Sequence, residues 1–412
     1  MKWPTVSLRQ VAPPERAAAR FAAEDVVWQL SLDQIESQTG RILKKVRGRV
    51  ADAGTSTFAF DEKHVLYSKL RPYLNKVARP DEPGLATTEL VPLRPVPGVL
   101  DADFLTFYLR SDAFVNFANL TVAGAKMPRM IMDRFWEHRV PVPPPREQRR
   151  IVELLEQADA LRRQHTEGEA LASRILPALF HKLFGNLGQD TKNWHCDALG
   201  SVIADTRNGI YKHADFYGRG TQILKMFNIL AGRLNLERVD YVEVTADEFA
   251  SYRLEPGDIL INRVNTPELV GKCAVIQSEL GDAVFESKNI RVRLNAALAH
   301  PEYVAHFLNT SFGHSTLCQG LKHAIGMATI NNSDLRNCRI PLPPIELQTE
   351  WAKHVAAART IATRTESSGK RIERLFQVLL HRAFTGELTA RWREAHMKEL
   401  LAEMELQSKA LA

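Results

Sequence analysis

Two long stretches of this chain carry apolar side chains at the spacing of an α-helix. One runs from about residue 146 to 184, and the other occupies the corresponding positions 200 residues later. Apolar residues three and four positions apart lie on one face of a helix. The predicted apolar faces consist of Ile151, Leu154, Ala158, Leu161, Ile175 and Leu179 in the first stretch and of Trp351, Ala358, Ile361, Ile372, Leu375 and Leu379 in the second.

Neither predicted helix can cover its apolar face alone, and two arrangements satisfy the pattern. The two helices pack against each other as an antiparallel coiled coil, or each packs on its own globular half. Gly168 and Gly369 near the middle weaken a continuous seam. Pro177 is expected to kink or break the first helix, whereas the second helix has Gln377 at the same position.

The residues outside the helices have mixed α and β character. Segments such as HVLYSKLRPYL and GDILINRV carry the apolar and β-branched residues of strands, whereas ADFLTFYLRS and PEYVAHFLNTSF indicate helices. The predicted fold is therefore α+β, with two similar mixed globular domains of about 140 residues and two long helices.

A proline-rich phrase occurs twice and precedes each long helix. Val140–Gln148 reads VPVPPPREQ, and Ile340–Gln348 reads IPLPPIELQ. Several prolines in a short stretch cannot lie in a helix interior or a central strand, so each phrase predicts a stiff joint from a domain into a helix. Both helices also end on the pattern H-[KR]-x-F, and Trp3 matches Trp194 near the start of each half. These matches indicate an internal duplication with pseudo-two-fold symmetry.

The duplication divides the chain into five segments. We predict a first domain at residues 1–143, a first helical region at 144–187, a second domain at 188–343, a second helical region at 344–389 and an amphipathic tail at 390–412. The tail is expected to pack on the helices or on a partner, or to fray as a surface helix.

Composition excludes several classes of protein and favours none strongly. The 412 residues carry a net charge of +6, which is compatible with nucleic-acid binding. The four cysteines form no C-x-x-C pair, so neither a zinc site nor a disulfide framework is expected. No apolar run is long enough to cross a bilayer and the N-terminus lacks the apolar core of a signal peptide, so we expect a cytoplasmic protein.

The sequence motifs of common enzymes are missing. The sequence contains no phosphate-binding loop, no G-x-G-x-x-G after a strand, no H-E-x-x-H, no G-x-S-x-G and no Asn- or Asp-Pro-Pro-Tyr/Phe segment of an amino-methyltransferase. Asp61, Glu62, Asp258 and Glu286 are scattered acids for which a solvated surface role is expected. The chain is therefore expected to be a binding or organising protein without catalysis or a metal site of its own.

The two copies of [IV]-P-[LV]-P-P-x-x-x-Q, each followed by a helix that ends in H-[KR]-x-F, resemble the DNA-specificity subunit of Type I restriction–modification enzymes. The second copy ends in HRAFTGEL, which is also typical of that family, and the resemblance extends from Trp3 to about Leu388. Glu147 stands where the second copy has Leu347, and Trp351 is unusual for a helix seam.

This resemblance implies a division of labour. Each globular half would be a target recognition domain that reads one half of a split site in double-stranded DNA, and the helices would form an antiparallel coiled coil that sets the spacing. Two modification subunits would dock on this frame and methylate adenine, and restriction subunits would join in some complexes. The chain would bind no cofactor itself, because S-adenosylmethionine, Mg²⁺ and ATP would belong to the partner subunits.

Candidate DNA contacts are basic or amide side chains in polar segments, since such groups bind phosphates and base edges. In the first half the candidates are Lys44, Lys45, Arg47, Lys69, Arg71, Lys76, Lys126 and Arg129. In the second half they are Arg263, Asn265, Lys272, Lys322, His323 and Asn331. The alternative functions are an architectural adaptor that joins proteins without reading DNA, and a self-sufficient DNA-modifying enzyme, for which the sequence lacks the motifs.

Overall fold

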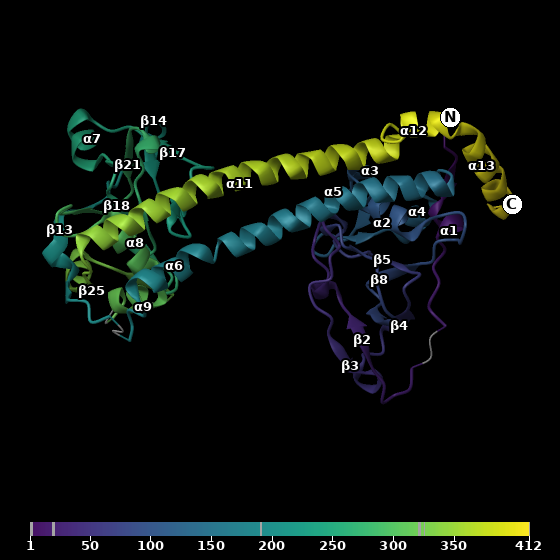
Figure 1. Cartoon of the computed structure of the whole chain (residues 1–412), viewed down its shortest axis with the longest axis horizontal. Helices are drawn as coiled ribbons and strands as arrows, with labels where there is room; N and C mark the ends of the chain where they lie inside the picture. The colour runs from purple at the N-terminus through teal and green to yellow at the C-terminus, as the bar shows by residue number, and fades with distance from the viewer. Residues whose placement is uncertain (1–2, 19–20, 190–191, 320–322, 325, 412) are drawn as a thin grey trace. The chain divides into compact units, whose positions relative to one another are not determined.

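The computed structural model describes residues 3–18, 21–189, 192–319, 323–324 and 326–411 (Figure 1). These residues form two compact units. The first unit comprises residues 1–167 together with 367–412, and the second comprises residues 168–366. Each unit therefore contains one globular half and helical segments from both halves of the sequence.

Most strands of the first unit form two small sheets. They are β2 (Val26–Leu30), β3 (Arg47–Arg49), β4 (Thr57–Phe60), β5 (Val65–Ser68), β6 (Val77–Ala78), β7 (Gly84–Thr87) and β8 (Leu90–Leu93). One sheet has the order β3-β2-β7-β4 with a parallel β2–β7 pair, and the other is antiparallel with the order β6-β5-β8. Trp28 and Phe60 meet edge to face at 5.3 Å between ring centroids in the core of the first sheet.

Helices cover the second of these sheets. They are α1 (Leu8–Val11), α2 (Ala102–Arg110), α3 (Asp112–Leu120), α4 (Met132–Glu137) and the long α5 (Pro145–Ala172). The Asp101 side chain begins α2 as an N-cap by accepting hydrogen bonds from the backbone N–H of Asp103 and Phe104. Tyr67 on β5 stacks on Phe135 at 4.9 Å between ring centroids, which ties the sheet to α4.

The second unit repeats this arrangement with a larger set of strands. They are β12 (Cys196–Ala198), β13 (Ile203–Asn208), β14 (Tyr217–Leu224), β15 (Ile229–Leu230), β16 (Arg233–Leu234), β17 (Asp240–Val242), β18 (Ile259–Asn262), β19 (Val264–Asn265), β20 (Cys273–Val275), β21 (Ala283–Phe285), β22 (Asn289–Leu294), β23 (His323–Ala324), β24 (Met327–Thr329) and β25 (Arg339–Pro341). The largest sheet has the order β13-β22-β18-β20 and is antiparallel throughout. Smaller sheets have the orders β17-β14-β21, β19-β24-β23, β12-β25 and β15-β16.

The helices of the second unit are α6 (Ile175–Phe184), α7 (Ala246–Tyr252), α8 (Pro301–Asn309), α9 (Ser311–Leu317), α10 (Asn332–Asn337) and the first part of α11 (Ile345–Thr385). The last part of α11 belongs to the first unit, as do α12 (Ala390–Ala395) and α13 (Met397–Leu411). Phe180 and Phe184 of α6 pack on Trp351 of α11 and on Tyr303 of α8. Mixed α and β elements therefore make up both units, as predicted.

The proline-rich joints have the same structure in both units. In the first unit β1 (Thr5–Ser7) pairs antiparallel with β11 (Arg139–Pro141), and Thr5 lies opposite Pro141. In the second unit β12 pairs with β25 in the same register, so that Cys196 lies opposite Pro341. Each short strand is followed after a few residues by a long helix, at Pro145 and at Ile345. The prediction of two equivalent joints is therefore confirmed.

The two long helices differ in continuity. In Figure 1, α11 is one uninterrupted helix of 41 residues, whereas a break separates α5 from α6. The break lies between Ala172 and Ile175, just before Pro177, whose missing N–H is tolerated in the first turn of α6. Pro177 therefore lies beside a helix break, as expected, and Gln377 allows α11 to continue.

In the first unit α5 runs antiparallel to the last part of α11. Gly369 lies against His165, and further along Arg162 lies above the ring of Phe376 at 4.1 Å and pairs with Glu373 at 2.8 Å. Residue numbers thus fall along α5 as they rise along α11. The buried core of this unit contains Ile151, Val152 and Leu155 of α5, Phe376, Leu380 and Ala383 of α11, and the side chains of the globular half. The apolar faces therefore pack both on each other and on the globular half.

The predicted seam is wrong at four positions. Leu161, Ile175, Ile361 and Leu375 are exposed. The inward face of α5 instead follows Ile151 and Leu155, and Phe376 occupies the buried position beside Leu375. Of the other predicted seam residues, Ile151 and Trp351 are buried, and Leu154, Ala158, Leu179, Ala358, Ile372 and Leu379 are half-buried. The error has a physical cause: the break before α6 changes the direction of its apolar face, and the middle contact in the first unit uses Arg162 in place of an apolar side chain.

Candidate nucleic-acid interface

Two basic segments that are far apart in the first half of the sequence lie side by side. The backbone N–H of Arg71 donates to the carbonyl of Pro128 at 2.7 Å, and that of Met130 donates to the carbonyl of Lys69 at 2.8 Å. The second segment forms a hairpin of β9 (Val122–Ala123) and β10 (Arg129–Met130). The structure thus brings Lys69 and Arg71 to the hairpin that carries the other predicted contacts.

The hairpin presents its basic side chains to solvent. Lys126 and Arg71 are exposed, and Lys69 is half-buried. Within the described residues, no ion pair joins any of these three side chains to an acid. Arg129 is exposed and pairs with Glu89 at 3.1 Å, and this hydrogen-bonded carboxylate raises the pKa of the guanidinium. Such solvent-exposed pairs exchange readily for a phosphate, because water already screens them.

The second unit builds the same contact from different residues. The backbone N–H of Ile330 donates to the carbonyl of Arg263 at 2.9 Å, and β19 pairs with β24 so that Val264 lies opposite Thr329. The segment after β18 therefore meets the β23–β24 hairpin, as the segment after β5 meets the β9–β10 hairpin. One backbone arrangement thus occurs in both halves of the duplication.

Several predicted contacts are instead held by the protein itself. Asn265 is buried and donates to Asn262 Oδ1 at 2.8 Å, so it is a scaffold residue and its prediction as a base contact is wrong. Lys76 donates to the carbonyl of Leu32 at 2.6 Å, which uses its ammonium inside the fold. Asn331 is the N-cap of α10, where its side chain accepts from two backbone N–H groups. These polar groups already have hydrogen-bond partners within the protein, and Lys76 and Asn331 stay predictions as DNA contacts.

The remaining candidates of the second unit differ in exposure. Arg263 is half-buried, and its Nε donates to the carbonyl of Ile330 at 3.3 Å. Lys272 is half-buried, and burial lowers the pKa of its ammonium. The backbone of His323 pairs with that of Ala328 in the hairpin, while the His323 side chain and the whole of Lys322 lie outside the described residues.

The early basic cluster of the first unit is largely neutralised by acids. Lys45 pairs with Asp81 at 2.7 Å, and its ammonium lies 5.1 Å from the ring centroid of Trp28. Arg47 pairs with Glu82 at 2.8 Å. Lys44 lies 3.8 Å from a carboxylate oxygen of Asp33. These side chains remain predictions as phosphate contacts, but each would first exchange a protein carboxylate.

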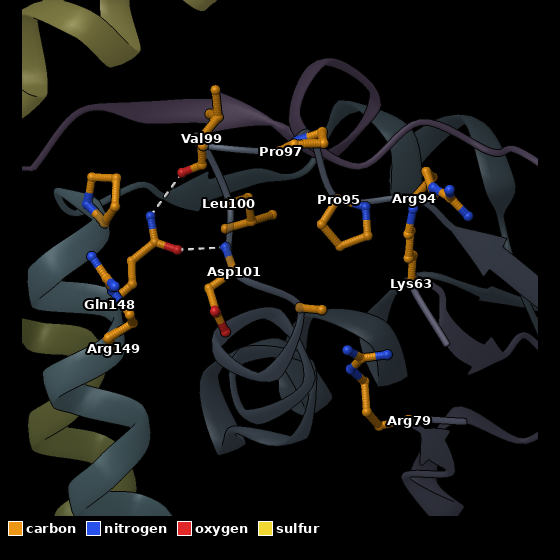
Figure 2. Close-up of a pocket in the computed structure, with 13 residues that line it drawn as sticks. Lys63, Arg79, Arg94, Pro95, Pro97, Val99, Leu100, Asp101, Gln148 and Arg149 are labelled. Atoms are coloured by element: carbon orange, nitrogen blue, oxygen red, sulfur yellow. Dashed lines mark hydrogen bonds between the residues drawn. The ribbon is translucent and has the colours of Figure 1, made fainter. Parts of the chain in front are cut away.

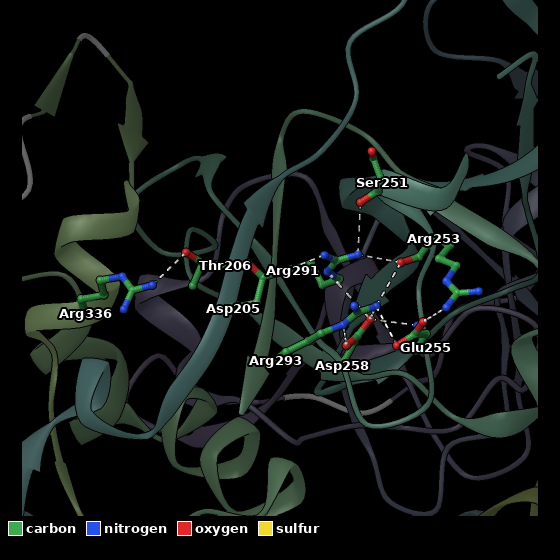
Figure 3. Close-up of polar contacts among 9 residues, drawn as sticks. All are labelled: Asp205, Thr206, Ser251, Arg253, Glu255, Asp258, Arg291, Arg293 and Arg336. Atoms are coloured by element: carbon green, nitrogen blue, oxygen red, sulfur yellow. Dashed lines mark hydrogen bonds and ion pairs between the residues drawn. The ribbon is translucent and has the colours of Figure 1, made fainter. Parts of the chain in front are cut away.

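Partly buried ion pairs brace the largest sheet of the second unit (Figure 3). Arg291 and Asp258 are both buried, and Arg291 pairs with Asp205 at 2.9 Å while Arg293 pairs with Asp258 at 2.8 Å. The expectation that Asp258 is a solvated acid is therefore wrong. Arg291 and Arg293 point into the protein, and a sequence gives no sign of this because their acid partners lie on other segments.

A basic cavity of about 470 Å³ lies at the joint of the first unit (Figure 2). Sequence reasoning missed its four cationic side chains, which come from four separate segments: Lys63, Arg79, Arg94 and Arg149. Arg94 pairs with Asp61 at 2.7 Å, so Asp61 is also no free surface acid. Burial alone would raise the pKa of Asp61, but hydrogen bonds from Arg94, the Lys63 backbone and His64 outweigh it and lower the pKa to about 2.

Strand register separates this cavity from the hairpin. On the β5–β8 pair Val65 lies opposite Leu93, next to Lys63 and Arg94 of the cavity. Ser68 lies opposite Leu90 at the other end of the pair, next to Lys69 of the hairpin contact. The two basic regions therefore lie at opposite ends of one strand pair.

The described residues contain no cluster of histidine, cysteine and acidic side chains that could hold a metal ion. All four cysteines are unpaired thiols. Burial raises the pKa of the Cys273 thiol to about 12, which makes it unreactive at neutral pH. No helix in the described part of the chain is both long and apolar enough to cross a membrane.

Comparisons with known proteins agree on one family. The sequence is 27% identical over 308 residues to the Type I restriction enzyme EcoKI specificity subunit of Escherichia coli K12, which covers 70% of this chain and 66% of that protein. It is 27% identical over 310 residues to the StySPI specificity subunit of Salmonella potsdam, which covers 71% of this chain and 67% of that protein. The chain thus matches about two thirds of the length of these relatives. No protein-family model matches the sequence.

The fold has counterparts among solved structures. A chain from a structure on complex assembly and conformational transition of the type I R-M system superposes with a TM-score of 0.62 at 20% identity, and the match covers 94% of this chain and 98% of that one. The S subunit of a Type-I restriction-modification system from M. genitalium superposes with a TM-score of 0.54 at 14% identity, covering 93% and 96%. In sequence and in fold, this chain therefore resembles the specificity subunits of Type I restriction enzymes, as its twice-repeated proline motif predicts.

Proposed function

We propose that this chain is the DNA-specificity subunit of a Type I restriction–modification complex in the cytoplasm. In this proposal each globular half reads one half of a bipartite site in double-stranded DNA. The long helices form a coiled coil that sets the distance between the half-sites and docks two modification subunits. The chain catalyses no step itself, and S-adenosylmethionine, Mg²⁺ and ATP are bound by the modification subunits and by restriction subunits where these are present.

One observation carries the proposal: the same backbone contact occurs in both units. In each, the segment that follows a central strand lies against a hairpin, through Met130 and Lys69 in the first unit and through Ile330 and Arg263 in the second. The hydrogen bonds of this framework are alike, while the side chains on it differ. A duplicated framework with different side chains suits two readers of different half-sites.

The reading itself divides between two kinds of contact. Lysines such as Lys126 suit phosphates, which position the protein without reading sequence. Arginines such as Arg129 and Arg71 suit guanine, because a guanidinium donates two parallel hydrogen bonds to its major-groove edge. We therefore assign orientation mainly to the lysines and sequence preference mainly to the arginines of the hairpin contact.

The length of α11 supports its role in spacing. A helix of 41 residues is about 60 Å long at 1.5 Å per residue. Half-sites one turn of B-DNA apart are separated by about 34–36 Å and face the same side of the duplex. A helix of this length is sufficient for that separation once part of it is used to anchor each globular half.

The proposal is tested by assembling the chain with a modification subunit from the same genome and mapping methylated adenines on genomic DNA. We expect methylation at one bipartite sequence with a fixed gap. Inserting about one helical turn into both long helices, next to Gly168 and Glu366, should change the gap and leave the half-site letters unchanged. Methylation without sequence preference would contradict the proposal and favour a protein adaptor.

A further inference from the structure

The C-terminal tail is bound to the first unit through a buried carboxylate. Glu147 has no exposed surface, and its two oxygens accept hydrogen bonds from Arg393 Nε at 2.7 Å, Thr389 Oγ1 at 2.6 Å and Trp3 Nε1 at 2.9 Å. The Arg393 guanidinium also lies 4.9 Å from the ring centroid of Trp3. The tail is therefore a fixed part of this unit, and the expectation of a frayed surface helix is wrong.

Two further contacts fix α13 along the joint. Arg146 pairs with Glu399, and with Glu403 at 3.0 Å. The Gln407 side chain donates to the carbonyls of Val99 and Pro143, at 3.0 Å each. These two carbonyls also accept from Gln148 of the repeated motif, at 2.8 and 2.7 Å. Figure 2 shows the contact between Gln148 and Val99. The tail thus completes a hydrogen-bond framework that the repeat begins.

The second unit repeats part of this framework and, among the described residues, has no tail on it. The Gln348 side chain accepts from the His300 backbone N–H at 2.9 Å, as Gln148 does from Asp101 at 2.7 Å, and it donates to the Pro343 carbonyl at 2.8 Å. By this match Leu298 corresponds to Val99. Within the described part of the chain, no side chain donates to the Leu298 carbonyl.

Val99 at the tail contact and its counterpart Leu298 differ most clearly in solvent exposure. Val99, whose carbonyl accepts from Gln407 of the tail, is 1% exposed, whereas Leu298 is 49% exposed. The apolar side chain at this tail contact is thus buried in the first unit, and its counterpart in the second unit is exposed to solvent. We call the residues Leu298, Glu346 and Leu347 the Leu298 face.

The residues that hold the tail are replaced on the Leu298 face. Buried Glu147 corresponds to Leu347, and Arg146 corresponds to exposed Glu346. Trp194, the counterpart of Trp3, donates instead to the Phe184 carbonyl at 2.9 Å and needs no carboxylate. The position of Arg146, which binds the tail glutamates, therefore carries the opposite charge in the second unit. The position of Glu147, which accepts from the tail arginine, carries an apolar side chain there.

These differences define what the Leu298 face can bind. In the first unit this position of the framework is occupied by a helix, α13. The tail of a second copy is excluded, because Glu399 and Glu403 would meet Glu346 and because Arg393 would lose its buried acceptor at Leu347. An opposite pattern fits: an apolar side chain against Leu347 and cationic side chains against Glu346.

We propose that the Leu298 face docks a basic amphipathic helix from a partner protein, and that the first unit cannot dock this helix because its own tail occupies the position. The proposal rests on the proposed function in one respect, since the partner is then a subunit of the restriction–modification complex. It predicts that two partner subunits bind the two ends of the chain in different ways.

A pair of labelled peptides tests the docking directly. One is the tail sequence 389–411, and the other is the same sequence with Arg393→Leu, Glu399→Lys and Glu403→Lys. Fluorescence anisotropy with the full chain should show that the altered peptide binds at least ten-fold more tightly than the natural one. Leu298→Glu and Glu346→Arg in the chain should each weaken the altered peptide at least ten-fold, while Leu269→Glu, at a residue also half-exposed on the second unit, should not.

Equal binding of the two peptides, or binding indifferent to Leu298→Glu, overturns the proposal. A second measurement uses the complex assembled with the modification subunit. Light scattering should show that Leu298→Glu loses one modification subunit of two. If the complex keeps both subunits and reads its site, the docking proposal falls and the proposed function stands. If the unaltered chain reads no DNA in any complex, the proposed function falls, and the peptide result still decides the docking face.

Discussion

Replacing Glu147 by leucine, the residue of the second copy, should release the tail from the first unit. The change leaves the Arg393 guanidinium, itself only 8% exposed, without its charged partner. Removing one partner of a buried ion pair costs about 3–5 kcal/mol. Because each 1.4 kcal/mol is a factor of ten, the fraction of molecules with an open tail should rise by about one hundred- to several thousand-fold. Opening returns Arg393 to water, so the loss cannot exceed the free energy with which the tail binds.

Hydrogen exchange of α13 measures this effect, since its backbone amides exchange when the tail opens. The double variant Glu147→Leu with Arg393→Leu should recover most of the protection, because an apolar pair of similar volume can replace a buried ion pair at little cost. Glu394→Leu, at an exposed neighbour of Arg393, serves as the control and should leave α13 protected. Unchanged protection in Glu147→Leu, or a double variant no better than the single one, would refute the reasoning.

Three further outcomes follow from the structure. Arg129→Ala should weaken or relax recognition of one half-site only, as measured by methylation sequencing of the assembled complex. The control Arg134→Ala, outside the hairpin, should leave recognition unchanged. Equal loss at both half-sites would contradict the assignment of Arg129. Asp61 has a pKa of about 2 in the folded chain, below its unfolded value near 4, so it contributes about 2 kcal/mol to the free energy of unfolding; this contribution is present above pH 4 and is lost as the pH falls toward 2. Urea unfolding at several pH values should show that Asp61→Asn loses less stability in acid than the unaltered chain. Identical pH dependence of the two chains would exclude this role. Trp351→Ala should destabilise the second unit by about 3–5 kcal/mol, since the indole is fully buried against Phe180; thermal unfolding that leaves this unit unchanged would show that its core does not depend on the indole.

The sequence was sufficient to predict the repeat and the joints, because both depend on backbone preferences of residues close together in the chain. Proline restricts its own backbone wherever it occurs, so two phrases with the same proline spacing must form similar connections. Pro177 likewise indicated the break before α6. The repeated Gln148 and Gln348 were visible as a match, but their role was not, since their carbonyl and N–H partners lie on other segments.

Side chains whose role depends on distant partners could not be assigned in this way. The sequence around Asn265 does not reveal whether its side chain faces DNA or donates to Asn262 within the protein. The seam failed for a related reason: apolar spacing predicts a helical face, but the choice between Leu375 and Phe376 depends on what packs opposite. Glu147 stood out as a departure between the copies, yet its partner Arg393 lies far along the chain.

The shared joint has a consequence for how such a protein can change over time. Between β12 and β25 the chain leaves and returns at neighbouring points, Cys196 and Pro341, and Gln348 anchors the helix with contacts made largely to backbone. A foreign domain inserted at these points would keep the same stiff joint and would disturb little outside itself. Under the proposed function, new target sequences would then arise by exchange of whole domains, without adjustment of the helix to each new domain.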